Sequence, residues 1–155
     1  MSNDKRCESW SVFNDCETQS EFVSAATALI PASHGSEGGF WERAARTLFV
    51  EMCVKLKSLG MTTNKALSDE LLKASLKQTH ARLKGTVADP LTSPDAAKMA
   101  QSIRAVLNTH GEALRFLPEG GRPFSIKEWI KRDDGEPSIL FITAQYVHLE
   151  TSREL

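Results

Sequence analysis

Basic side chains gather in the middle of this 155-residue sequence. Residues 55 to 84 include seven lysines and arginines but only two acidic residues, so this stretch carries a net charge of +5 in a chain whose overall charge is −1. Lysine and arginine bind phosphate groups, and such a stretch favours contact with a nucleic-acid backbone. The side chains that we assign to this contact, or to contact with a partner protein, are Lys65, Lys73, Lys77, Arg82 and Lys84.

Three of these lysines have the spacing of a helix face. Lys73, Lys77 and Lys84 are separated by four and seven residues, which predicts a row of positive charge along one helix face that could follow a phosphate backbone. A solvated surface helix would show the same spacing. The sequence has no clear base-reading motif and no aromatic platform on which bases could stack. Both interpretations of the lysines therefore stay open.

No group of residues has the spacing of a catalytic or metal site. The four histidines are dispersed along the chain: His34, His80, His110 and His148. The three cysteines, Cys7, Cys16 and Cys53, form neither a CxxC motif nor a Cys/His pattern. Because their number is odd and their spacing irregular, we interpret them as reduced thiols rather than as disulfides or zinc ligands.

The glycine-rich stretch 32–39, "ASHGSEGG", does not have the chemistry of a phosphate-binding loop. A Walker A loop requires the pattern GxxxxGK[ST], in which the lysine and the hydroxyl contact phosphate and magnesium. Here Gly39 is followed by Phe40 and Trp41. The chain also lacks an acidic Walker B strand. We therefore expect no cofactor in this chain and no enzyme activity of its own.

The surrounding pattern predicts one mainly α domain, a compact bundle of several helices. Hydrophobic residues make up 41% of the chain, enough for a core, and no apolar run approaches the roughly 18 residues that cross a bilayer. Helix-start signals lie at Thr18 with Glu21, at Ser75, at Ser93, and at Ser125 with Glu128. Helices are predicted over residues 19–30, 41–59, two segments within 62–85, 94–109 and 125–132.

Two stretches that flank the predicted helices have sequences typical of β-strands. Residues 138–149, "SILFITAQYVHL", form an apolar, β-branched run typical of a buried parallel strand, and residues 10–13, "WSVF", are short and aromatic. Little else in the chain could pair with them. We therefore interpret 10–13 and 138–144 as strand remnants of a sheet in another domain, and we expect them to lie close together.

Seven short pieces along the chain carry a family resemblance. They are "WSVFN" at 10–14, "LIP" at 29–31, Phe40–Trp41 with Ala45–Arg46, "GTVADPL" at 85–91, "SIRAVL" at 102–107, "FSIKEWI" at 124–130 and "LFIT" at 140–143. In this order the pieces resemble the all-alpha domain of type IV secretion coupling proteins, the TraD and TrwB type of conjugative plasmids. The resemblance covers nearly the whole chain.

This resemblance implies a larger parent protein. The parent would be a homohexameric motor at the bacterial inner membrane, with ATP and magnesium bound to a RecA- or FtsK-like ATPase domain. The 155 residues would be a single all-alpha domain inserted into that ATPase domain, facing the cytoplasm and making no direct membrane contact.

The resemblance also implies a role in substrate recognition. The domain would contact the relaxosome nucleoprotein or a secreted effector before ATP-driven transfer. Its partners would be a relaxase, accessory relaxosome proteins, effectors, and single- or double-stranded DNA. The alternative is a domain that only docks proteins, or a regulatory spacer at the mouth of the hexamer, with no DNA binding.

Overall fold

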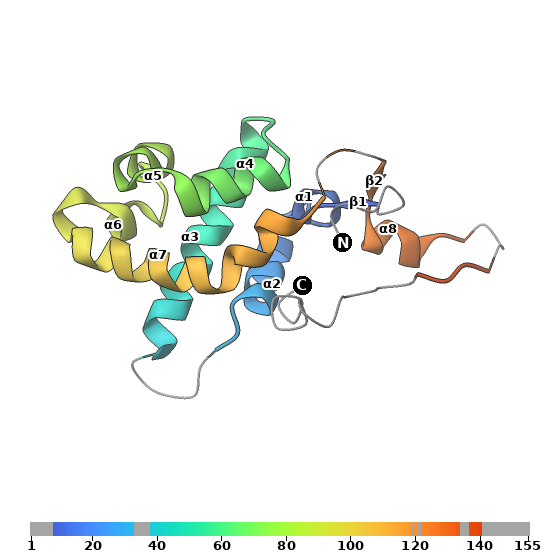
Figure 1. Ribbon diagram of the computed structural model, residues 1–155, viewed down its shortest axis with the longest axis horizontal. Coiled ribbons are helices and arrows are strands. Elements are labelled where there is room, and N and C mark those ends of the chain that lie inside the picture. Colours follow the sequence, from blue (N-terminus) through green and yellow to red (C-terminus); the bar gives the residue numbers. More distant parts are fainter. Residues whose placement is uncertain (1–7, 33–37, 119, 121, 134–136, 141–155) are drawn as a thin grey trace.

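The computed structural model describes residues 8–32, 38–118, 120, 122–133 and 137–140, and over these ranges the chain is a mainly α domain (Figure 1). None of the helices in these ranges combines the length and the apolar character needed to span a bilayer. The elements in chain order are β1 (Ser9–Trp10), α1 (Val12–Asp15), α2 (Gln19–Leu29), α3 (Gly38–Ser58), α4 (Asn64–Ser68), the π-helical turn η1 (Asp69–Lys73), α5 (Leu76–Leu83), α6 (Asp89–Thr92), η2 (Pro94–Ala96), α7 (Ala97–Gly111), η3 (Glu112–Phe116), β2 (Pro123–Phe124) and α8 (Ile126–Lys131).

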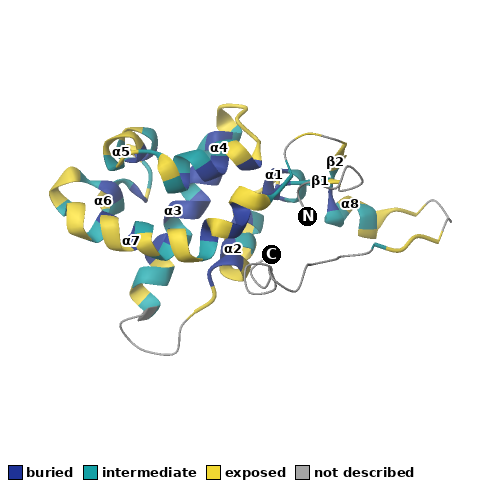
Figure 2. Ribbon diagram, in the orientation of Figure 1, coloured by how far each residue is buried: buried dark blue, intermediate teal, exposed yellow. Residues whose placement is uncertain are grey.

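The helix α3 is the centre of the core. One face of it is buried, as the apolar spacing predicts, and this face is formed by Ala44, Ala45, Leu48, Phe49, Met52, Cys53 and Leu56. α2 and α7 pack against α3, and Figure 2 shows the buried residues concentrated where these helices meet. On α7 the buried hydrophobic side chains are those of Ala100, Ile103 and Leu107, which are three, four and seven residues apart. The helical fold expected from the sequence is confirmed.

The helix starts follow the capping residues. Thr18 and Glu21 form a capping box at α2, in which each side chain accepts from the other's backbone N–H. Ser75 does the same with Gln78 at α5, and Ser125 accepts from the N–H of Glu128 at α8. These caps satisfy backbone donors that the first helical turn leaves without partners. All three starts lie where the sequence predicted them.

The strand predicted over residues 10–13 is wrong in extent. β1 contains only Ser9 and Trp10, because the side chain of Ser11 accepts from Phe13 N–H at 3.2 Å and starts the helical turn α1. β1 pairs in parallel with β2, Pro123–Phe124, a strand that the sequence analysis did not predict. Of the second predicted strand, 138–140 have no regular secondary structure, and 141–144 lie outside the described residues.

Two polar residues of α1 hold β1, β2 and α8 together. The side-chain amide of Asn14 donates to the carbonyls of Ser9, at 3.1 Å, and Phe124, at 3.0 Å. The carboxylate of Asp15 accepts from Trp10 Nε1, from Ser125 Oγ at 2.5 Å and from Lys127 N at 3.0 Å. Segments about 110 residues apart in the sequence are thus joined at one end of the molecule.

Candidate nucleic-acid interface

The predicted basic residues lie on both sides of a break in the helix. Lys65 in α4 and Lys73 in η1 precede it, and Lys77 and Arg82 in α5, with Lys84 directly after α5, follow it. α4 continues into η1, η1 ends at Lys73, and α5 begins only after Ala74 and the cap Ser75. Lys73 is therefore not on the same helix as Lys77, and the prediction that Lys73, Lys77 and Lys84 share one helix face is wrong. The serine cap is the reason, because it satisfies the first N–H groups of a new helix at that position. We use the name η1–α5 surface for Lys65, Asp69, Glu70, Lys73, Lys77, Arg82 and Lys84.

Three of the five predicted cations have carboxylate partners. Asp69 accepts from Lys65 and, at 2.6 Å, from Lys73, so one carboxylate lies between two ammonium groups. The hydrogen bonds from Lys65 and then Lys73 lower the pKa of Asp69 below its usual range. Glu70, whose side chain is only 15% exposed, pairs with Arg82. These three cations are engaged within the protein.

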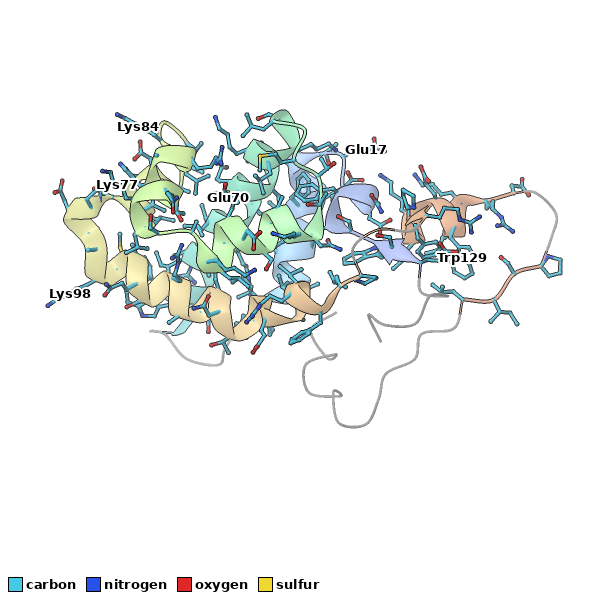
Figure 3. The ribbon with its side chains drawn as sticks, turned by 45° about the horizontal axis from the view of Figure 1, so that its top comes forward. Glu17, Glu70, Lys77, Lys84, Lys98 and Trp129 are labelled. Carbon is cyan, nitrogen blue, oxygen red and sulfur yellow. The ribbon has the colours of Figure 1, made fainter. Side chains whose placement is uncertain are left out.

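The other two predicted cations are not engaged in this way. Lys77 and Lys84 are exposed, and neither forms an ion pair with a described residue. Lys77 lies in the first turn of α5, and Lys84, seven residues later, directly follows its last residue, Leu83. Figure 3 shows both side chains pointing into solvent at the end of the molecule far from Trp129 in α8. Of the five residues chosen from sequence, these two have the charge available for an outside anion.

A shallow depression lies between η1 and α5. Its volume is about 560 Å³, and it is lined by Asp69, Glu70, Lys73, Ala74, Gln78, Ala81 and Arg82. Every one of these side chains is polar, charged or alanine. The depression therefore offers hydrogen-bonding and ionic groups but no aromatic ring on which a base could stack.

Arg104 of α7 contacts both the break between η1 and α5 and α5 itself. Its guanidinium donates to the carbonyl of Ala74 in the break and, at 2.9 Å, to Thr79 Oγ1 in α5. Burial lowers the pKa of Arg104. The role of Arg104 could not be predicted from the sequence, because the fragment around it carried only the family resemblance and its contacts are 25 and 30 residues away.

The basic stretch of the sequence does not form one continuous surface. Lys57 points toward α1, where its Nζ donates to the carbonyls of Cys16 at 2.9 Å and Glu17 at 3.2 Å. Lys55 and Lys57 both belong to the last turn of α3 and not to the η1–α5 surface, so that surface has five cations and two carboxylates, a net charge of +3. Folding thus lowers the charge available from the +5 counted over residues 55 to 84.

One exposed cation at this end was missed. Lys98 is the second residue of α7, and Figure 3 shows it projecting from the same end of the molecule as Lys77 and Lys84. A lysine in the first turn of a helix faces the positive end of the helix dipole, which is unfavourable by about 0.3–1 kcal/mol. Helix stability alone favours an acidic residue there, but the sequence predicts a helix start at residue 94, so only the structure places Lys98 in the first turn of α7.

Neither the cysteines nor the histidines of the described ranges form a site. Cys16 and Cys53 are buried free thiols whose pKa values burial raises, and Cys53 belongs to the apolar face of α3 as predicted. His80 lies 3.2 Å from Thr92 Oγ1 and 3.5 Å from a carboxylate oxygen of Asp89. Within the described part of the chain, no three His, Cys, Asp or Glu side chains are grouped so that they could hold a metal ion.

Comparison with known proteins shows which family this chain belongs to. A family model described as the type IV secretion-system coupling protein DNA-binding domain matches residues 3–155. The chain belongs to this family. Coupling protein TraD of Escherichia coli (strain K12) is 32% identical to it over 146 residues, which are 91% of this chain and 20% of TraD. The chain therefore spans about a fifth of the length of this curated relative.

Solved structures of another coupling protein share the fold. The plasmid coupling protein TrwB in complex with the GTP analogue GDPNP is 27% identical, with a TM-score of 0.73 over 85% of this chain and 32% of TrwB. TrwB in complex with ADP and Mg²⁺ gives a TM-score of 0.74 over 87% of this chain, again at 27% identity. The all-alpha domain of a coupling protein, expected from seven short pieces of sequence, is confirmed.

The two described hollows of this coupling-protein domain lack the lining of a nucleotide-phosphate cradle. Besides the depression at η1 and α5, a groove of about 220 Å³ lies between α2 and α3 and is lined by Gln19, Val23, Ala26, Thr27, Arg46, Thr47, Val50, Glu51 and Val87. No glycine lines either hollow, whereas a phosphate cradle needs glycine backbone that approaches the phosphates closely. We therefore derive no chemistry through a nucleotide in these residues.

Proposed function

We propose that this chain is the substrate-recognition domain of a conjugative coupling protein and that it contacts the DNA backbone through the η1–α5 surface. The observation that carries this proposal is the position of Lys77 and Lys84. Both are exposed, both lack a carboxylate partner among the described residues, and both point outward at the same end of the molecule (Figure 3). Charged side chains in this state bind phosphate without first giving up an internal partner.

The chemistry of the surface favours contact with phosphates rather than with bases. The depression between η1 and α5 has no aromatic lining, so bases cannot stack in it, and lysine ammonium groups recognise phosphate as point charges. Contacts to phosphate position a protein on DNA but carry no sequence information. We therefore expect weak binding that is independent of sequence and sensitive to salt.

Lys98 extends the same surface. It comes from α7, next to the elements α5 and α6, and adds a third exposed cation to Lys77 and Lys84 at this end. Its unfavourable position at the start of α7 fits a role in binding better than a role in stability. We include Lys98 in the proposed contact.

The position of the surface suits a domain that belongs to a larger protein. β1, β2 and α8 lie at the opposite end of the molecule, where β1 pairs with β2 (Figure 1). The rest of the coupling protein would attach at that end and leave the η1–α5 surface free for the substrate. In this proposal the parent is a homohexamer at the inner membrane, ATP and magnesium bind to its motor domain, and the substrate is a nucleoprotein whose relaxase, accessory proteins or effectors dock on the helical surface.

Charge reversal at the two lysines tests the DNA contact. Lys77→Glu with Lys84→Glu should weaken binding to a labelled single-stranded oligonucleotide by about tenfold or more at about 50 mM salt, because two phosphate contacts become repulsive. A matched control is Arg122→Glu with Lys131→Glu, which makes the same charge change on exposed residues near α8. We expect the control to change affinity by about twofold at most, because screening weakens charges at that distance.

Three other results would contradict the proposal. If both double variants weaken binding equally, the effect comes from overall charge and not from this surface. If the unaltered chain binds no strand at low salt, the domain acts by protein docking alone or as a spacer. If it binds but the Lys77 and Lys84 variant binds equally well, the contact lies elsewhere.

A further inference from the structure

Two acidic residues sit within the cations of the η1–α5 surface. Asp69 and Glu70 are adjacent in the π-helical turn η1, and both line the depression beside Lys73 and Arg82. Their carboxylates are the partners of Lys65, Lys73 and Arg82. In a surface that binds phosphate, these carboxylates occupy the cations that a phosphate oxygen would otherwise contact.

The contacts of Asp69 resemble those of a phosphate group. One of its oxygens accepts from Lys65 and the other from Lys73 at 2.6 Å, so a single anion bridges two ammonium groups four residues to either side. The lysine side chains are 68% and 57% exposed, and that of Asp69 is 34% exposed. Exposed ion pairs of this kind contribute only about 0–1 kcal/mol, so an outside anion can compete for the lysines.

Glu70 and Arg82 form a more protected pair. Their side chains are 15% and 33% exposed, and they link η1 to α5 across the depression. A less exposed pair is less weakened by salt and harder to exchange. The two pairs therefore define an outer position, at Asp69, and an inner position, at Glu70, that DNA phosphates could enter.

We propose that Asp69 and Glu70 act as internal substitutes for phosphate, which keep the DNA affinity of the η1–α5 surface low until a nucleic-acid backbone displaces them. This inference rests on the proposed function, because it concerns the same surface. It predicts that Lys77 and Lys84 make the first contacts, and that Lys65, Lys73 and Arg82 join only when their carboxylate partners are displaced. A strand held this way is released readily, which suits a domain that passes its substrate on.

The test removes the two negative charges and keeps the shape of the side chains. Asp69→Asn with Glu70→Gln should bind a mixed-sequence, single-stranded oligonucleotide about tenfold more tightly than the unaltered chain at about 50 mM salt. Loss of the carboxylate partners of Lys73 and Arg82 should also make the slope of log K against log salt steeper by about 1.4 units, since each added contact to a single strand contributes about 0.7. Asp69→Asn alone should give a smaller gain, and it leaves the Glu70–Arg82 pair intact should the double variant unfold.

A matched control separates this effect from total charge. Glu17→Gln with Glu128→Gln removes two negative charges from exposed residues of the opposite half of the molecule and should leave affinity within about twofold. An equal gain in the control would overturn the inference, as would folded Asp69 and Glu70 variants that bind no more tightly than the unaltered chain. If the unaltered chain binds DNA through Lys77 and Lys84 but the carboxylate variants show no gain, only this inference fails. If neither the unaltered chain nor the variants bind DNA at low salt, the proposed function fails as well.

Discussion

Whether a lysine of this surface can bind an outside anion depends on its immediate neighbours. Lys73 and Lys77 are both exposed and four residues apart, yet Lys73 has Asp69 at 2.6 Å and Lys77 has no ion-pair partner among the described residues. Side chains four residues apart on a helical segment can meet, so the two pairs of Asp69 could have been found from spacing. The Glu70–Arg82 pair could not, because its members lie on different elements and 12 residues apart.

Asp15 is the residue whose loss should damage the structure most directly. Asp15→Ala removes the acceptor of Trp10 Nε1, Ser125 Oγ and Lys127 N and leaves those donors without partners. Hydrogen bonds to a charged group contribute about 1.5–3 kcal/mol, so the free energy of unfolding should fall by about 2–4 kcal/mol. Urea unfolding measures this change, with Asp133→Ala, an exposed residue near the end of α8, as the control expected to stay within about 0.5 kcal/mol. Equal losses in both variants would show that Asp15 does not hold α8.

At the scale of the elements, three helix caps were predicted correctly, whereas the cap at Ser11 and the pairing of β1 with β2 were not. The starts of α2, α5 and α8 follow from capping residues within four positions of each other. The pairing of β1 with β2 joins Ser9 to Pro123 and leaves no comparable pattern in the sequence. The residues 10–13 were read as one strand because a short aromatic run resembles a strand, whereas Ser11 acts as a helix cap.

Pro90 illustrates how an element tolerates a residue that usually breaks it. α6 spans only Asp89–Thr92, and the proline stands in its first turn. The backbone nitrogen there has no intrahelical partner in any helix, so the missing N–H costs nothing. The packing of α6 beside α5 and α7 depends on the fold.

Glu21 should make stability depend on pH at the junction of α2 and α8. The hydrogen bond from Lys127, at 2.6 Å, and those from the backbone of Thr18 and Glu17 lower the pKa of Glu21 from 4.5 to about 2. Because the folded pKa is depressed, the stabilisation is fully present above pH 4.5 and is lost as pH falls toward about 2. The unfolding free energies of the unaltered chain and of Glu21→Gln should therefore differ at pH 7 and converge near the acid limit. A difference that is the same at both pH values would rule out this role.

At the scale of the whole molecule, one end of the domain joins distant segments of the chain and the other end presents exposed positive charge. The end with β1, β2 and α8 joins segments distant in sequence through Asn14 and Asp15, and the end with α5 and α6 carries the exposed lysines (Figures 1 and 3). The family and the mainly α fold could be predicted from the sequence, because ordered motifs and helical spacing are both local properties. The division of charge over the surface could not, because it depends on contacts between helices.

The chain by itself should not hydrolyse ATP. Its sequence has no GxxxxGK[ST] loop, and no glycine lines the hollows on η1–α5 and on α2–α3. We expect no magnesium-dependent phosphate release above the rate of a buffer blank, and no change in melting temperature when ATP and magnesium are added. Turnover that persists through several purification steps and follows the protein peak would contradict this expectation.

The salt dependence of DNA binding tests the central claim most directly. The affinity of the unaltered 155-residue chain for a mixed-sequence single strand should be measured by fluorescence anisotropy from about 50 to 200 mM salt. If Lys77, Lys84 and Lys98 contact phosphates and release counterions, log K should fall linearly with log salt, with a slope of about −2. The slope should be the same for strands of different sequence, because phosphate contacts do not read bases. Absence of binding at the lowest salt, or binding whose affinity does not change with salt, would contradict the account.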